Sequence, residues 1–332
     1  MIVTLTPNPS VDRALTVPAL ERGEVLRATD VRVDAGGKGV NVARAITAQG
    51  GEAIAVLPSG GPEGHLLEEL LDAAGVARRS VPVAGSSRMN VSVLEPDGTT
   101  TKLNEPGPRL SGDEVEALLA ATLDASGPAA RPTGDDAPDT SPSRPTWIVG
   151  CGSLPPGAPV DLYATLVERG RAAGARVAID SSGAAFTAAV AARPDLIKPN
   201  HEELAELVGH ALPSLYDVRA AARDLVAHGI PTVAVSLGSH GALLVTADLL
   251  VHARATIARP RSTVGAGDCM LAGLLDGFAG GLEGNGALTR GVAWGAAAVT
   301  LPGSRVPSPD HTSRITVDLT ENPDLTMELG HS

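Results

Sequence analysis

The sequence predicts an α/β protein with three layers, in which helices cover both faces of a mostly parallel central sheet. Short apolar strands alternate with helical patterns along most of the 332 residues, and glycine-rich turns join many strands to the helices that follow. Hydrophobic residues make up 43% of the chain, which is enough for a sizeable core. We expect one large domain over residues 1–310 and a loosely packed C-terminal tail over 311–332, with a strand near 314–319.

The elements of the expected domain follow from apolar periodicity and from turn residues. Strands are predicted at residues 2–6, 53–57, 147–149, 176–180, 232–236, 242–245 and 249–257, and in the segment that ends at Lys198. Helices are predicted at residues 42–48, 63–74, 111–123, 159–173, 184–192, 217–228, 268–278 and 287–300, and from Asn200 onward.

Two polar β segments do not suit a central sheet. Residues 13–34 are strand-like but hydrophilic, and residues 87–104 alternate on both sides of the turn Pro96-Asp97-Gly98, as a hairpin does. One face of this hairpin carries Arg88, Asn90, Lys102 and Asn104. Plain solvent exposure explains such a face, and so does a small β lid over a polar substrate.

Composition limits the classes of partner. The net charge of −12 argues against nucleic acid and anionic membranes, although a locally basic cleft can still bind a small anion. Cys151 and Cys269 are far apart in the sequence and suggest free thiols. The first residues lack the pattern of a signal peptide, and no apolar run reaches the ~20 residues of a membrane helix. We therefore expect a cytoplasmic protein.

Residues 125–146 form a separate stretch rich in Pro, Ala, Asp and Ser, without apolar periodicity. This composition is typical of a disordered surface insertion.

The sequence STVGAGD at residues 262–268 is the strongest chemical signal. It follows a β stretch and opens an apolar helix, so that Gly265 and Gly267 lie at a helix start and Asp268 lies in the first turn. Unpaired N–H groups at a helix start attract anions, and a carboxylate beside them can take a proton. The pattern suits phosphoryl transfer to a hydroxyl, but for the motif taken alone helix capping by Asp268 is the favoured explanation.

Other polar turns follow further predicted strands. Lys38 and Asn41 lie in a second glycine-rich helix start, which suits an anionic or polyhydroxylated ligand. Asn200 and Glu203 have the spacing of a capping box, and also of a polar pair that orders water around Mg²⁺. The turn from Ser236 to Gly241 could hold a nucleotide. Because carboxyl ends of parallel strands share one edge of a sheet, we expect these turns to converge.

These motifs together resemble the ribokinase-like sugar kinases, and within them the phosphofructokinase B (PfkB) family. The similar segments, in family order, are TPNPSVD from Thr6, AGGKGVNVA from Ala35, RMNV from Arg88, GSLPPG from Gly152, KPNHEEL from Lys198, SLGSHGA from Ser236, and STVGAGD. They span nearly the whole chain, and the set is most similar to family members that phosphorylate fructose 1-phosphate. Members acting on tagatose 6-phosphate or fructose 6-phosphate are the alternatives, as is a sugar-phosphate-binding regulator without turnover.

The resemblance implies a role for each motif. Asp268 would be the catalytic base, and Gly265, Ala266 and Gly267 would form the anion hole. The residues implied for the sugar phosphate are Asp12, Gly37, Lys38, Asn41, Arg88, Asn90, Lys102 and Ser153. Those implied for ATP are Lys198, Ser236, Gly238, Gly241 and Thr263, and those implied for Mg²⁺ are Asn200 and Glu203.

The resemblance also implies a monovalent-cation loop, with K⁺ held by backbone near Val264 and Gly303. Exposed lid strands leave edges that a second subunit can cover, so a homodimer through the β lid is expected. The chain departs from the family pattern at Cys269, where serine is common, and at residues 301–307.

Overall fold

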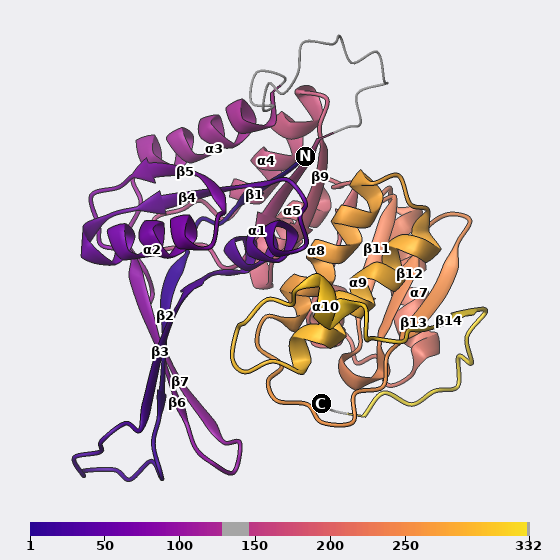
Figure 1. Ribbon diagram of the computed structural model, residues 1–332. Helices are drawn as coiled ribbons and strands as arrows, with labels where there is room; N and C mark the ends of the chain where they lie inside the picture. Colours follow the sequence, from indigo (N-terminus) through magenta and orange to yellow (C-terminus); the bar gives the residue numbers. More distant parts are fainter. Residues whose placement is uncertain (128–145, 331–332) are drawn as a thin grey trace.

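The computed structural model describes residues 1–127 and 146–330, and its centre is a twisted ten-stranded sheet (Figure 1). The strand order is β14-β13-β12-β11-β10-β9-β8-β1-β4-β5. The strands from β11 to β5 in this order are parallel, and β12, β13 and β14 continue the sheet in antiparallel pairs. Their bounds are β1 Ile2–Leu5, β4 Ala53–Ser59, β5 Ala77–Pro82, β8 Trp147–Cys151, β9 Arg176–Asp180, β10 Leu196–Ile197, β11 Thr232–Ser236, β12 Ala242–Val245, β13 Leu250–Arg254 and β14 Asp318–Glu321.

Helices cover both faces of this sheet, which confirms the predicted three layers. One face is covered by α1 Lys38–Ala48, α2 Gly61–Ala73, α8 Ala266–Ala279 and α9 Gly284–Val299. The other is covered by α3 Gly112–Ser126, α4 Leu162–Ala172, α5 Gly183–Ala191, α6 His201–Val208 and α7 Leu215–Ala227. A short helix, α10 Pro309–Thr312, follows α9. Successive strand residues enter opposite cores, as the two-residue period requires: Ile148 packs on one side and Val149 on the other.

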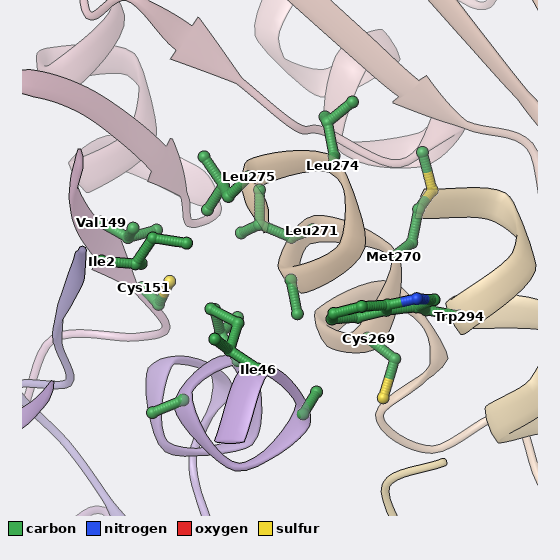
Figure 2. Packing of buried hydrophobic residues seen from close by; sticks show 14 of the residues in the cluster. Ile2, Ile46, Val149, Cys151, Cys269, Met270, Leu271, Leu274, Leu275 and Trp294 are labelled. Carbon is green, nitrogen blue, oxygen red and sulfur yellow. The ribbon is translucent and has the colours of Figure 1, made fainter. Parts of the chain in front are cut away.

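Helix α8 is the most deeply packed of the helices that matter for the site. Figure 2 shows Leu271 and Leu275 of this helix facing the sheet residues Ile2 and Val149. Its other side lies against α9, where a Cβ atom added to Gly291 would come within 2.9 Å of the backbone oxygen of Met270. Glycine at that position therefore permits the close helix contact. This packing fixes the start of α8 relative to the sheet.

A separate four-stranded sheet projects from the body (Figure 1), in the order β3-β2-β6-β7. Its strands are β2 Ser10–Thr16, β3 Asp30–Gly36, β6 Arg88–Leu94 and β7 Thr100–Asn104. The small β sheet was predicted, but two details differ. Residues 17–29 are irregular rather than strand-like, and β6 pairs in parallel with β2, which joins the two predicted β segments into one sheet.

The boundaries of two predicted segments also change. Helix α3 runs to Ser126, and Ala125 is buried, so the helix continues into the start of the insertion predicted at 125–146. Residues 128–145 of that prediction lie outside the described residues. Within the described part of the predicted tail, residues 311–330, the chain is better packed than expected, because β14 extends the central sheet and Leu329 is buried in the core. The strand predicted near 314–319 lies slightly later, at Asp318–Glu321.

Both cysteines are free, as predicted, and both are buried. None of the helices in the described part of the chain is long and apolar enough to cross a membrane.

Candidate active site

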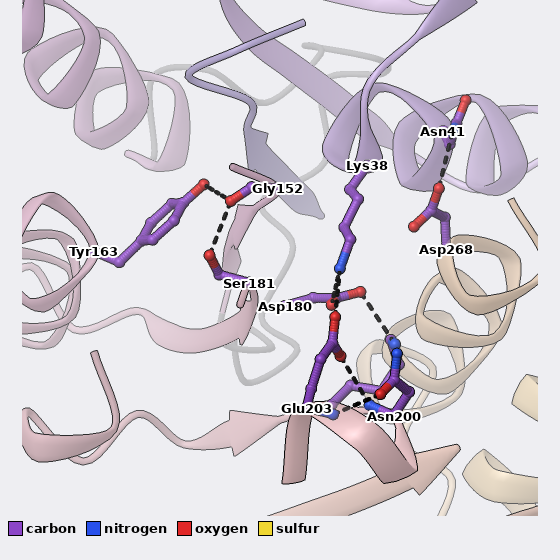
Figure 3. A network of polar contacts seen from close by, with 10 residues as sticks. Lys38, Asn41, Gly152, Tyr163, Asp180, Ser181, Asn200, Glu203 and Asp268 are labelled. Atoms are coloured by element: carbon purple, nitrogen blue, oxygen red, sulfur yellow. Dashed lines mark hydrogen bonds and ion pairs between the residues drawn. The ribbon is translucent and has the colours of Figure 1, made fainter. Parts of the chain in front are cut away.

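Asp268 lies in the first turn of α8, and its carboxylate is directed away from its own helix toward α1 (Figure 3). Gly265 precedes the helix with a left-handed φ of 78°, a conformation that favours glycine. Across residues 1–127 and 146–330, the hydrogen bond found for this carboxylate comes from Asn41, whose Nδ2 donates to Oδ2 at 2.8 Å. Helix capping therefore does not account for Asp268.

The surroundings of Asp268 make it a better proton acceptor than an exposed carboxylate. Asp268 is only 8% exposed. Burial raises the pKa of Asp268 to about 6, the nearby Asp180 carboxylate adds to the rise, and the hydrogen bond from Asn41 opposes it. Lys38 and Lys198 also oppose it. The carboxylate is thus ionised at neutral pH but accepts a proton more readily than usual.

Two ammonium groups and a buried carboxylate form an ion-pair network beside Asp268 (Figure 3). Lys38 Nζ lies 2.9 Å from Asp180 Oδ1, and Lys198 Nζ lies 3.1 Å from Asp180 Oδ2. Burial alone raises the pKa of Asp180, but the charges of Lys198 and Lys38 outweigh it and hold that pKa below its usual range. Burial lowers the pKa of Lys38, but the carboxylates of Asp180 and Glu203 outweigh burial, and the pKa lies above its usual value. Lys38 therefore stays charged.

Asp180 is the functional residue that the sequence prediction missed. It ends β9, is 1% exposed, and is the common partner of both lysines. The available signal was its place at a strand end, on the same edge of the sheet as the other polar turns.

Asn200 and Glu203 form the capping box of α6. Glu203 Oε2 accepts from the backbone N–H of Asn200 at 2.8 Å, and Asn200 Oδ1 accepts from the backbone N–H of Glu203 at 2.7 Å. Glu203 Oε1 also contacts Lys38 Nζ at 3.4 Å. The capping interpretation is therefore correct, and Glu203 in addition faces the ion-pair network.

The donor set suits Mg²⁺ held mainly through water. Among the described residues no group of three His, Cys, Asp or Glu side chains is close enough to form a metal cage. Mg²⁺ commonly uses one or two carboxylates together with water and substrate phosphates, and Glu203 with the Asn200 amide provides oxygen donors of that kind.

The polar face of the small sheet adjoins this edge. Asp12 Oδ1 accepts from Ser10 Oγ at 2.6 Å and from Asn90 Nδ2 at 3.1 Å. Asn90 is paired with Asn104, and Ser92 with Lys102, so Lys102 is on the same face but further out. The predicted polar face of Arg88, Asn90, Lys102 and Asn104 is therefore present.

Arg88 and Ser153 line an open pocket of about 610 Å³ together with Asn8. Arg88 Nη2 donates to the backbone oxygen of Asn8 at 2.9 Å, which holds the guanidinium at the base of the small sheet. Gly37, the N-cap of α1, lies beside Lys38.

Lys198, Ser236, Gly238 and Gly241, which were predicted for ATP, lie at or just after the ends of β10 and β11, whereas Thr263 lies in the turn before α8. Asn200 forms a parallel bridge with Ser236, and the turn Gly238–His240 with Gly241 follows directly. A Cβ atom added to Gly267 would lie 3.6 Å from Lys198 Nζ, so an ammonium group borders the predicted anion hole. Within that hole, the Ala266 N–H already donates to the Thr263 oxygen at 3.3 Å.

The three-layer fold and this group of side chains define an α/β phosphotransferase. The profile described as "pfkB family carbohydrate kinase" matches residues 6–124 and 139–311. The chain therefore belongs to the pfkB family of carbohydrate kinases.

Characterised relatives and solved structures agree with this assignment. The chain is 37% identical over 316 residues to a 1-phosphofructokinase of Rhodobacter capsulatus, covering 95% of each protein. It is 35% identical over 317 residues to the ATP-dependent 6-phosphofructokinase isozyme 2 of Escherichia coli, covering 95% of this chain and 97% of that one. The structure of phosphofructokinase-2 from Escherichia coli in complex with potassium has a TM-score of 0.85 and 33% identity, covering 94% of this chain and 97% of that chain.

Proposed function

We propose that the protein transfers the γ-phosphoryl group of ATP to fructose 1-phosphate and forms fructose 1,6-bisphosphate. The observation that carries this proposal is the buried Asp268 carboxylate, with its raised pKa, beside the ammonium groups of Lys38 and Lys198. The 1-phosphofructokinase names of the relatives support this substrate.

Asp268 acts as the base in this mechanism. The free hydroxyl oxygen of the sugar attacks the γ-phosphorus in line, the bond to the β–γ bridging oxygen breaks, and ADP leaves. The hydroxyl proton passes to Asp268. The N–H groups at Gly265 and Gly267 stabilise the charge on the phosphoryl oxygens, and the Ala266 N–H joins them when it turns from the Thr263 oxygen to the phosphoryl group. Lys198 borders this position.

The small sheet binds the sugar phosphate and covers it. We assign the sugar hydroxyls to Asp12, Asn90 and the Gly37–Lys38 turn, and the existing phosphate to Arg88 and Lys102, with Ser153 as the facing wall. Closure of the sheet over the substrate excludes water, which would otherwise compete as acceptor.

ATP binds beside the turns that follow β10 and β11 and the turn before α8. Ser236, Gly238, Gly241 and Thr263 contact the nucleotide in this assignment. Asn200 and Glu203 hold Mg²⁺ through water, and the ion supplies charge neutralisation on the phosphates when bound. Backbone near Val264 and Gly303 is the position for K⁺, supported by the potassium complex of the Escherichia coli protein.

A coupled ADP-release assay tests the substrate. We expect the highest kcat/KM with fructose 1-phosphate when it is compared with fructose 6-phosphate and tagatose 6-phosphate. The second candidate is fructose 6-phosphate, favoured by the 35% identity to the 6-phosphofructokinase isozyme. A clear preference for either 6-phosphate would replace the proposed reaction.

The pH profile of kcat/KM tests the state of the base. Asp268 must be ionised to accept the proton, and its pKa is raised to about 6. Activity should therefore be constant above this pKa and fall about tenfold per pH unit below it. A profile that stays flat down to pH 5 would contradict the assignment.

We also propose a homodimer through the outer face of the small sheet. Val31 on the edge strand β3 is 55% exposed, and Leu103 on the opposite edge strand β7 is 62% exposed. Large apolar side chains exposed on one face are candidates for an interface. The variant Leu103→Glu should shift the mass measured by light scattering from dimer to monomer, because the charge would be buried in the interface. A wild-type protein that is monomeric at micromolar concentration would contradict the proposal.

The buried free thiols of Cys151 and Cys269 support a reducing, cytoplasmic location.

A further inference from the structure

Arg44 connects the candidate base to the interior of the small sheet through Asn41. It lies one turn after Asn41 on α1, and its side chain is only 11% exposed. Its Nη1 donates to Asn41 Oδ1 at 3.2 Å and to the backbone oxygen of Ala35 at 2.8 Å. Asn41 in turn donates to Asp268 Oδ2. A continuous path of hydrogen bonds therefore runs from Arg44 to the carboxylate.

The donor and acceptor types allow one orientation of the Asn41 amide. A guanidinium has donors and no acceptor, and an ionised carboxylate has acceptors and no donor. If the amide were turned by half a rotation, its NH₂ group would face Arg44 and its oxygen would face Asp268. Both contacts would then be repulsive. Arg44 and the ionised Asp268 thus both select the orientation in which Asn41 presents its NH₂ group to the carboxylate.

We propose that Arg44 is a positioning residue for the base, which it controls by fixing the orientation of the Asn41 amide. This inference rests on the proposed role of Asp268. The bond from Asn41 holds Oδ2, and so directs Oδ1 of the same carboxylate toward the sugar hydroxyl. Asn41, predicted only as a sugar ligand, then has a second function in orienting the base.

The charges around this path are compatible with a constant role across the working pH range. Asp34 Oδ1 lies 3.9 Å from Arg44 Nη2, and Arg32 Nε donates to the other oxygen of Asp34 at 2.7 Å. Asp12 and Cys269 also lie near Arg44. Burial lowers the pKa of Arg44 and these acidic groups oppose the change, while a guanidinium keeps its proton at any working pH.

Two substitutions separate donor chemistry from packing. Lysine, like arginine, only donates, so Arg44→Lys should keep the amide oriented and retain most of the turnover. Glutamine can donate or accept, so Arg44→Gln should leave Asp268 alone to select the orientation of the Asn41 amide and should weaken the selection. We expect kcat of Arg44→Gln to fall about tenfold, with KM for ATP and for the sugar phosphate within about twofold of wild type.

The pH profile gives a readout that a purely structural role would not move. Burial and the Asp180 carboxylate raise the pKa of Asp268. The hydrogen bond from Asn41 lowers this pKa, as do the charges of Lys38 and Lys198. Weakening that bond in Arg44→Gln should move the acid limb of kcat to higher pH. The limb of Arg44→Lys should stay at the wild-type position.

A double-mutant cycle tests whether Arg44 acts through Asn41. Arg44→Gln should lower kcat in the wild-type background but change it by less than about twofold in an Asn41→Ala background. Equal losses in both backgrounds, or a loss in Arg44→Lys as large as in Arg44→Gln, would overturn the proposal. Melting temperatures identify any variant that is simply unfolded, and the Lys and Gln variants are compared only as folded proteins.

The same assay includes Asp268→Asn, which separates the proposed role of Arg44 from the proposed role of Asp268 as the base. If Asp268→Asn is inactive and the cycle is additive, only the role of Arg44 is wrong. If Asp268→Asn retains turnover within tenfold of wild type, the base assignment is wrong and the role of Arg44 falls with it.

Discussion

Replacing Asp268 with asparagine should reduce kcat by about 10²–10⁴-fold while leaving ATP binding unchanged. The amide keeps the size of the side chain but cannot take the hydroxyl proton. Because Asp268 lies at the start of a buried helix and is bonded by Asn41, the change should not displace its neighbours. Steady-state ADP release measures kcat, and calorimetric titration measures ATP affinity.

A second aspartate on the same helix provides the matched control. Asp276 lies further along α8 and bonds Arg290 at 2.6 Å, away from the network around Asp180. Asp276→Asn should retain kcat within about threefold. Turnover of Asp268→Asn within tenfold of wild type would remove Asp268 as the base.

Replacing Asp180 with asparagine should produce the largest loss of stability. The carboxylate neutralises two lysines, of which Lys198 is almost fully buried, and the amide would leave their charges facing each other. Removing one partner of a buried ion pair costs about 3–5 kcal/mol in the free energy of unfolding. Urea denaturation near pH 7 measures this change, and a loss below about 1 kcal/mol would contradict the account.

The double variant Asp180→Leu with Lys198→Met is the control for this effect. It removes the buried charges from both sides and replaces them with apolar groups of similar volume, so stability should recover in part. Turnover should remain low, since the ammonium group beside Gly267 is gone.

The ion pairs of Asp180 also make the free energy of unfolding sensitive to acid. The pKa of Asp180 is held down in the folded protein, so its stabilisation is present above the unfolded pKa and is lost as pH falls through the folded pKa. The contribution of Asp268 to stability changes with pH in the opposite direction, because its raised pKa favours the folded state at low pH.

The chain order of strands and glycine turns was sufficient to predict the edge of the sheet where the site forms. Lys38 and Glu203 are 165 residues apart, yet they lie within 3.4 Å of each other. Glu203 follows β10 in the parallel part of the central sheet, whereas Lys38 follows β3 of the small sheet. Asp268 follows the antiparallel strand β13, and the packing of α8 against α1 places it beside Asn41. The rule for the ends of parallel strands therefore accounts for the positions of Lys198 and Glu203, but not for those of Lys38, Asn41 and Asp268.

Partners that depend on packing could not be predicted in this way. Nothing in the local sequence indicates that Asp180 joins two lysines, or that Arg44 bonds Asn41, since these contacts depend on how the side chains are directed in three dimensions. The parallel pairing of β2 with β6 and the addition of β14 to the sheet are long-range contacts of the same kind. Propensity and periodicity describe neighbours in sequence and leave such pairings open.

The central claim is that the protein catalyses phosphoryl transfer to a sugar phosphate, rather than only binding one as a regulator would. A single-turnover experiment tests this claim most directly. ATP labelled with radioactive γ-phosphate is mixed with fructose 1-phosphate and with enzyme in excess over ATP. We predict one labelled fructose 1,6-bisphosphate per ATP consumed, and negligible ADP formation without sugar. Binding of both ligands without any labelled bisphosphate would contradict the account.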